Sequence, residues 1–150
     1  MVLRQQASSQ PCVACALGSR GCACRMRVQG AGLYLSAITY ATLQGCVVSG
    51  NVASNTGGGW WVSQRSMLTM TASTTSGNRA AVSGGGGWCS DAVVTLSRDT
   101  LSGNSAVAQG GGLLVSGGCL LNANASDVVG NSAVTGGASL MHICRGSARN

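Results

Sequence analysis

The chain has 150 residues, with 24 glycines, one proline, no phenylalanine and a formal net charge of +6. This length suits one domain, but its apolar residues are mainly Ala, Val, Leu and Cys, so a core built on large aromatic side chains is not expected. The single proline excludes collagen-like and proline-rich disordered chains. The scattered arginines indicate a solvated basic surface rather than a nucleic-acid site. No apolar stretch is long enough for a transmembrane helix.

The N-terminal segment, residues 1–28, is rich in cysteine and precedes a repeat domain over residues 29–150. It lacks a convincing secretory signal, because its apolar stretch from Cys12 to Leu17 is short and ends at a glycine. Its cysteines could form a disulfide-stabilised cap or a zinc site, although their spacing is not that of the familiar paired zinc ligands. A third interpretation is a degenerate capping rung, with Cys24 in the column of Asn51. The four cysteines are Cys12, Cys15, Cys22 and Cys24.

A phrase, Ser-Gly-Asn-x-Ala followed by a run of glycines, repeats through the rest of the chain. Its asparagines are Asn51, Asn78, Asn104 and, in a weaker copy, Asn131, at steps of 27, 26 and 27 residues. A fixed period of this length is typical of stacked repeats in which each copy is one structural unit.

Each unit contains three short segments that alternate apolar and polar residues, as strands do. In chain order within a unit, the first follows the glycines, the second lies in the middle, and the third leads into the asparagine. Three strands in 26–27 residues predict an all-β fold, a right-handed parallel β-helix of about four to five rungs, with equivalent strands about 4.8 Å apart. Helical solenoids are disfavoured, because glycine triplets, Thr, Ser and Val form helices poorly.

The repeated asparagines are interpreted as a structural ladder. Asparagine tolerates the left-handed backbone of a tight turn, and stacked amides can hydrogen-bond from rung to rung. The predicted ladder consists of Asn51, Asn78, Asn104 and Asn131, and we assign it no catalytic role.

A candidate ligand face combines outward residues of the second strand with tryptophans beside the glycine corners. Strand alternation requires one of Trp60 and Trp61 to point outward. Such a polar ladder could bind a glycan or, by resemblance to Thr-rich ice-binding solenoids, ice; the alternative is a face kept polar for solubility. The candidate residues are Trp60, Trp61, Trp88, Thr42, Thr69, Thr71 and Thr95.

Catalytic chemistry is not predicted, and no cofactor is expected. The three acidic residues include Asp99 and Asp127, which differ by one position in the aligned units and should point to different faces. His142 beside Cys144 is interpreted as incidental. The remaining cysteines are expected to be buried small hydrophobic residues, with Cys119 and Cys144 the best placed to stack; these are Cys46, Cys89, Cys119 and Cys144.

Two tetrads resemble the GGA-aliphatic and FxxN motifs of the polymorphic outer membrane protein repeats. They stand here as Gly110-Gly111-Gly112-Leu113 and Leu101-Ser102-Gly103-Asn104, with related copies in the other units, although phenylalanine is replaced throughout. The resemblance spans roughly residues 30–137 and implies β-helical stalks or adhesive passengers of surface proteins.

We therefore expect a structural or adhesive scaffold, extracellular or at the cell surface, that forms a piece of a longer protein with flanking repeats. Its expected partners are glycans or a host or cell-surface protein. The alternative is a fragment of a polysaccharide-active, pectate lyase-like β-helix enzyme whose catalytic residues lie elsewhere.

Overall fold

The computed structural model describes residues 23–24, 32–137 and 139–141, which form strands and turns without any helix. Equivalent strands of successive turns stack along one axis and form four parallel sheets around it. The first sheet contains β2 (Leu33–Leu35), β6 (Trp60–Ser63), β10 (Gly87–Ser90), β14 (Leu113–Ser116) and β17 (Ser139–Met141). The second contains β3 (Tyr40–Gln44), β7 (Met67–Thr71), β11 (Val93–Ser97) and β15 (Leu120–Asn124). The third contains β1 (Ala23–Cys24), β4 (Val47–Ser49), β8 (Thr74–Ser76), β12 (Thr100–Ser102) and β16 (Asp127–Val129). A short sheet contains β5 (Val52–Ala53), β9 (Arg79–Ala80) and β13 (Ser105–Ala106).

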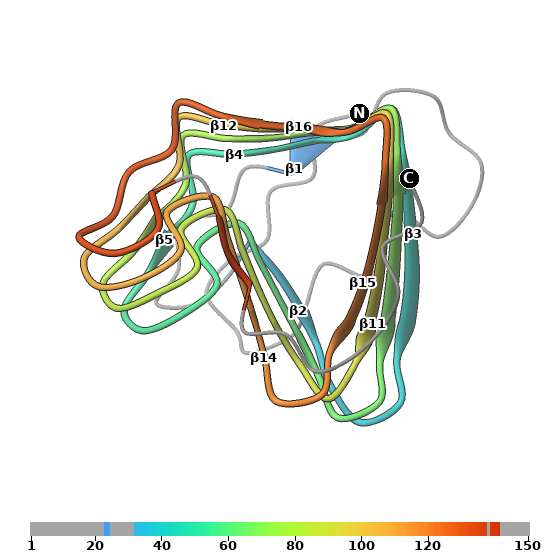
Figure 1. Ribbon diagram of the computed structural model, residues 1–150. Coiled ribbons are helices and arrows are strands. Elements are labelled where there is room, and N and C mark those ends of the chain that lie inside the picture. Colours follow the sequence, from blue (N-terminus) through green and yellow to red (C-terminus); the bar gives the residue numbers. More distant parts are fainter. Residues whose placement is uncertain (1–22, 25–31, 138, 142–150) are drawn as a thin grey trace.

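The predicted all-β parallel β-helix is confirmed, with about four turns. Figure 1 looks down its axis: equivalent strands of successive turns overlie one another, the first three sheets form the long sides of the cross-section, and the short sheet and glycine loops form a lobe beside the first sheet. The short sheet is an element that the sequence pattern did not reveal, because two-residue strands are too short to alternate visibly.

The register follows the aligned repeats. Trp60 pairs with Gly87, and Gly87 with Leu113, so one unit is a residue shorter, as the 26-residue step from Asn78 to Asn104 predicted. One alignment was wrong: Cys24 pairs with Val48, three residues before Asn51, and therefore does not lie in the asparagine column. The proposed boundary between residues 28 and 29 falls outside the described residues.

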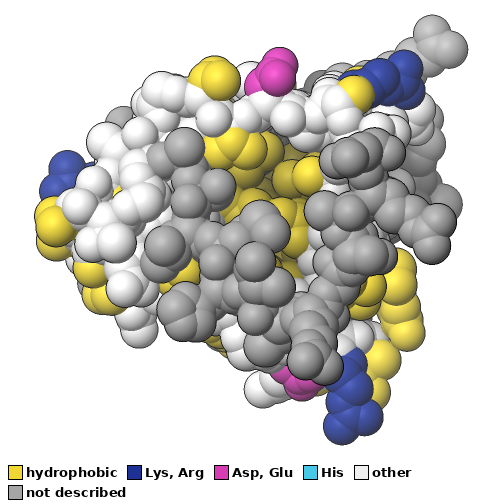
Figure 2. Space-filling view, in the orientation of Figure 1, with side chains coloured by type: hydrophobic (Ala, Val, Ile, Leu, Met, Phe, Trp, Pro, Cys, Tyr) yellow, Lys and Arg dark blue, Asp and Glu magenta, His cyan; other side chains and the backbone are white. Residues whose placement is uncertain are grey.

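The core is a single apolar column lined by the inward residues of the three long sheets. In the second sheet Leu68, Met70, Val94 and Leu96 are essentially inaccessible to solvent. Figure 2, in the same orientation, shows hydrophobic side chains in the middle of the cross-section and charged ones at its rim. This placement follows from the two-residue period of each strand, which sends alternate side chains inward.

Glycines occupy the corners that need a left-handed backbone. The corner before each ladder asparagine has φ between 61° and 64° at Gly50, Gly77, Gly103 and Gly130. The asparagines themselves are not left-handed, so the expectation that they make the turn is wrong: the preceding glycine makes it. The other expected reason, hydrogen bonding between stacked amides, stands.

Candidate functional site

The four asparagines form a continuous hydrogen-bonded ladder inside the wall. The backbone N–H and the side-chain amide of Asn51 both donate to Oδ1 of Asn78, at 3.0 and 2.9 Å. Asn78 donates in the same way to Asn104, and Asn104 to Asn131. The first three side chains are fully buried, so their polar atoms face one another and not a ligand.

A second polar column, which the sequence did not suggest, runs along the corner between the second and third sheets. The backbone N–H of Cys46 donates to Oγ of Ser73, that of Ser73 to Oδ1 of Asp99, and that of Asp99 to Oγ of Ser126. The other carboxylate oxygen of Asp99 accepts from the backbone N–H of Ser97 at 2.7 Å. Burial raises the pKa of Asp99 above its ordinary 3.8, although the hydrogen bonds from Ser73 and Ser97 act in the opposite direction.

The three tryptophans do not all lie on the candidate ligand face. Trp60 is 0 % exposed and fills the core, so its assignment to the ligand face is wrong. The physical reason lies in the next rung, where Gly87 pairs with Trp60 and a side chain at that glycine would overlap the indole ring. Glycine at this position makes room for the largest side chain in the core.

Trp61 points outward, but both faces of its ring are covered. Its indole stacks on Tyr34 with ring centroids 4.3 Å apart and on Trp88 with centroids 5.0 Å apart. Sugar binding to an aromatic platform requires a free ring face, and neither face of the Trp61 indole is free. Tyr34 was missed by sequence reasoning, although its place in the strand aligned it with Trp61.

The outer face of the second sheet presents three columns of side chains in register. The middle column contains Thr42, Thr69, Thr95 and Asn122, and the outermost contains Gln44, Thr71, Ser97 and Asn124. A third column, which we did not predict, is apolar and contains Tyr40, Met67, Val93 and Leu120. Tyr40 is 68 % exposed, so the predicted threonine ladder lies beside a solvent-accessible apolar stripe. We call these three columns the threonine face.

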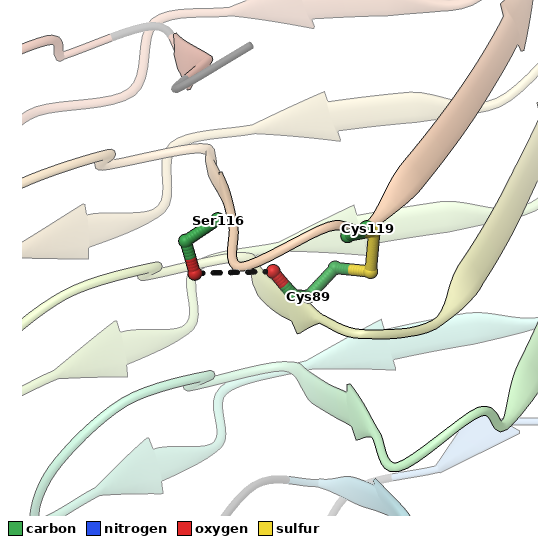
Figure 3. The surroundings of a disulfide bond; sticks show 3 residues. All are labelled: Cys89, Ser116 and Cys119. Carbon is green, nitrogen blue, oxygen red and sulfur yellow. Dashed lines mark hydrogen bonds between the residues drawn. A yellow bond between two sulfur atoms is a disulfide. The ribbon is translucent and has the colours of Figure 1, made fainter. Parts of the chain in front are cut away.

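Two of the cysteines are joined across successive turns. Cys89, an inward residue of β10, forms a disulfide with Cys119 at the corner before β15, with Cα atoms 5.8 Å apart. Figure 3 shows this bond next to the hydrogen bond from Oγ of Ser116 to the carbonyl of Cys89. Cys89 and Cys119 are buried as expected, but they form a disulfide, which the sequence did not predict, whereas Cys46 is buried and unpaired. The side chains of Cys12, Cys15, Cys22, Cys24, His142 and Cys144 lie outside what the structure describes.

The acidic residues do not converge. Asp99 is buried, whereas Asp127, one aligned position later, and Asp91, at another corner, are exposed, as the one-position offset of Asp99 and Asp127 implied. Within residues 32–137, no three His, Cys, Asp or Glu side chains gather where they could hold a metal ion. The described residues also include no helix of the length and hydrophobicity needed to cross a membrane.

These features define a parallel β-solenoid whose polar ladders and disulfide are structural and whose threonine face is open. Comparisons of the chain with protein-family models, with curated proteins and with solved structures find no match.

Proposed function

We propose that this solenoid is the rigid scaffold of an extracellular or cell-surface protein and that the threonine face is its adhesive surface, with a glycan as the favoured partner. The observation that carries the proposal is the register of the face: an apolar column with an exposed tyrosine lies beside columns of hydroxyl and amide side chains. A sugar ring has the same two characters, with C–H groups that pack on apolar surface and hydroxyls that exchange hydrogen bonds. Successive rungs repeat this arrangement about every 4.8 Å, which suits a polymer of repeating units.

The proposed location is supported by the disulfide between Cys89 and Cys119. Disulfides form and persist in oxidising compartments and are rare in the reducing cytosol. The resemblance of the glycine and asparagine tetrads to polymorphic outer membrane protein repeats points in the same direction, because that family is built of surface stalks and passengers. Flanking repeats in a longer chain are part of this proposal.

A glycan array probed with the soluble chain tests the adhesive role. The informative variant is Thr69→Lys, which places a long charged side chain in the middle of the threonine face. Its matched control is Thr74→Lys in the same rung, because Thr74 is also half-buried but belongs to the outer face of the third sheet. We expect saturable binding that Thr69→Lys weakens about tenfold or more and Thr74→Lys leaves intact.

Two results would contradict the proposal. Binding that survives Thr69→Lys but is lost in a folded Trp61→Ala variant would place the site at the aromatic column. Binding to no glycan would contradict the proposed partner, and capture of a defined surface protein that Thr69→Lys abolishes would then assign the threonine face to a protein. The enzyme alternative gains no support from the described residues, because their carboxylates do not cluster.

A further inference from the structure

Asn124 begins the sequence Asn124-Ala125-Ser126, which has the form of an acceptor for N-linked glycosylation. That signal is Asn-x-Ser/Thr, with any residue except proline at x. None of the six other asparagines between residues 51 and 131 has Ser or Thr two residues later. This part of the chain therefore contains one candidate acceptor.

The structure leaves the side chain of Asn124 accessible. It is the last residue of β15, is exposed, and belongs to the outermost column of the threonine face. Thr71 and Ser97, which precede it in that column, are also partly exposed, so the column faces solvent in the inner rungs as well. Within residues 32–137 the amide of Asn124 takes part in no hydrogen bond, unlike the amides of the asparagine ladder.

The other residues of this sequence hold it on an outward corner. Ala125 has φ of 49° and turns the chain from the second sheet to the third. The hydroxyl of Ser126 donates to the carbonyl of Asn124 at 3.1 Å and accepts from the backbone N–H of Asp99, also at 3.1 Å. Ser126 thus has a structural task in the second polar column, whereas the side chain of Asn124 has none.

We propose that Asn124 is an acceptor site for an N-linked glycan. In the transfer, Nδ2 of Asn124 loses a proton and bonds to the anomeric carbon of an oligosaccharide, while the bond from that carbon to a lipid-linked pyrophosphate breaks and the pyrophosphate leaves. The disulfide between Cys89 and Cys119 supports the proposal, because secreted proteins acquire disulfides in oxidising compartments. The inference rests on the proposed extracellular location but not on the adhesive role.

The test is the intact mass of the full 150-residue chain after secretion from yeast behind a cleavable leader. We expect the chain to carry one glycan that peptide N-glycosidase removes. This enzyme converts the modified asparagine to aspartate, so peptide mapping after the treatment should find aspartate at position 124. Asn124→Gln should have the mass of the unmodified chain.

A corner two rungs earlier provides a matched gain of the site. There the sequence is Thr71-Ala72-Ser73, Ala72 also has φ of 49°, and the hydroxyl of Ser73 donates to the carbonyl of Thr71. Thr71→Asn should therefore carry a second glycan. Asn122→Gln changes the neighbouring exposed asparagine, which has no Ser or Thr two residues later, and should keep the single glycan.

Two results would each overturn the proposal: a secreted parent chain without a glycan, and a glycan that persists in Asn124→Gln. The first uses the parent chain, so it does not depend on the folding of any variant. Failure of the proposed location is distinguishable, since it would appear as free thiols at Cys89 and Cys119 in the protein isolated from its own cells. Failure of the adhesive role would appear only on the glycan array.

Discussion

The side-chain amide of Asn78 donates to Oδ1 of Asn104 at 3.0 Å, and the backbone N–H of Asn78 donates to the same oxygen, also at 3.0 Å. The second amide hydrogen of Asn78 reaches the carbonyl of Val48 in the preceding rung. One side chain thus links three rungs, and this explains why the repeat needs asparagine in a position where glycine already makes the turn.

Replacing Asn78 by alanine should be strongly destabilising. The change removes the acceptor for both donors of Asn51 and leaves the carbonyl of Val48 without its amide partner, all in a buried site. Each buried polar group left unsatisfied costs about 1–3 kcal/mol, so we expect a loss of about 3 kcal/mol or more in the free energy of unfolding. Urea denaturation followed by circular dichroism measures it.

The control for this change is Asn122→Ala on the exposed threonine face, which should alter stability by less than about 0.5 kcal/mol. Equal effects of the two substitutions would mean that the ladder contributes nothing beyond the loss of a polar side chain.

Thr75 should be replaceable by valine with a gain in stability. Its column otherwise holds Val48, Leu101 and Val128, and among the residues that the structure describes its buried hydroxyl has no hydrogen-bond partner. Burying a hydroxyl without a partner costs at least about 1 kcal/mol, and Thr75→Val keeps the shape while removing the hydroxyl, so we expect a gain of about 1 kcal/mol. The urea midpoint should rise.

Thr74→Val provides the comparison. It removes the same hydroxyl group, but Thr74 is half-exposed and water can reach its hydroxyl. A Thr75→Val variant that is less stable than the parent chain would show that its hydroxyl makes a hydrogen bond in solution.

The sequence predicted the register well and the contacts between different columns poorly. The asparagine and glycine columns were recognisable because each rung needs the same residue at the same turn, such as a glycine with positive φ at Gly77 and at Gly103. The burial of Trp60 was not recognised, since it depends on Gly87 in the next rung and two adjacent tryptophans give no sign of which one points inward. The threonine column was predicted, whereas the apolar column with Tyr40 beside it was missed, because it starts each strand before the alternation becomes visible.

The disulfide shows the same difficulty. Cys89 and Cys119 are 30 residues apart and occupy different positions in their units, so an alignment of the repeats separates them, although the fold places a core position of one turn beside a corner of the next. Diagonal contacts of this kind appear only when the rungs are stacked in three dimensions.

Removing this disulfide should cost stability without changing the fold. Closing a loop of this length in the unfolded chain corresponds to about 3–4 kcal/mol in the chain-entropy description, and we expect a loss of that order in Cys89→Ala/Cys119→Ala. The difference between the unfolding free energies of the parent chain with and without reductant measures the same quantity.

Cys46→Ala is the control, because Cys46 is buried but unpaired, and its effect should be the same in reducing and oxidising buffer. Peptide mapping under non-reducing conditions that found Cys119 joined to another cysteine would contradict the pairing.

Asp99 should make stability depend on pH in an unusual direction for a carboxylate. Desolvation raises its pKa in the folded chain above 3.8, so the folded state binds this proton more tightly than the unfolded state does. Its contribution to stability is therefore fully present below about pH 4 and is lost as the pH rises through the raised pKa.

Asp99→Ser removes the titration but keeps a side-chain oxygen, as Ser73 does one rung earlier. The stability of the parent chain relative to Asp99→Ser should therefore fall as the pH rises from 4. Asp99→Asn removes the titration as well, but its amide nitrogen would face a backbone N–H and lower stability equally at every pH. Unfolding free energies of the three proteins between pH 4 and 7 separate the effects, and parallel curves for the parent chain and Asp99→Ser would show that the pKa of Asp99 is not raised.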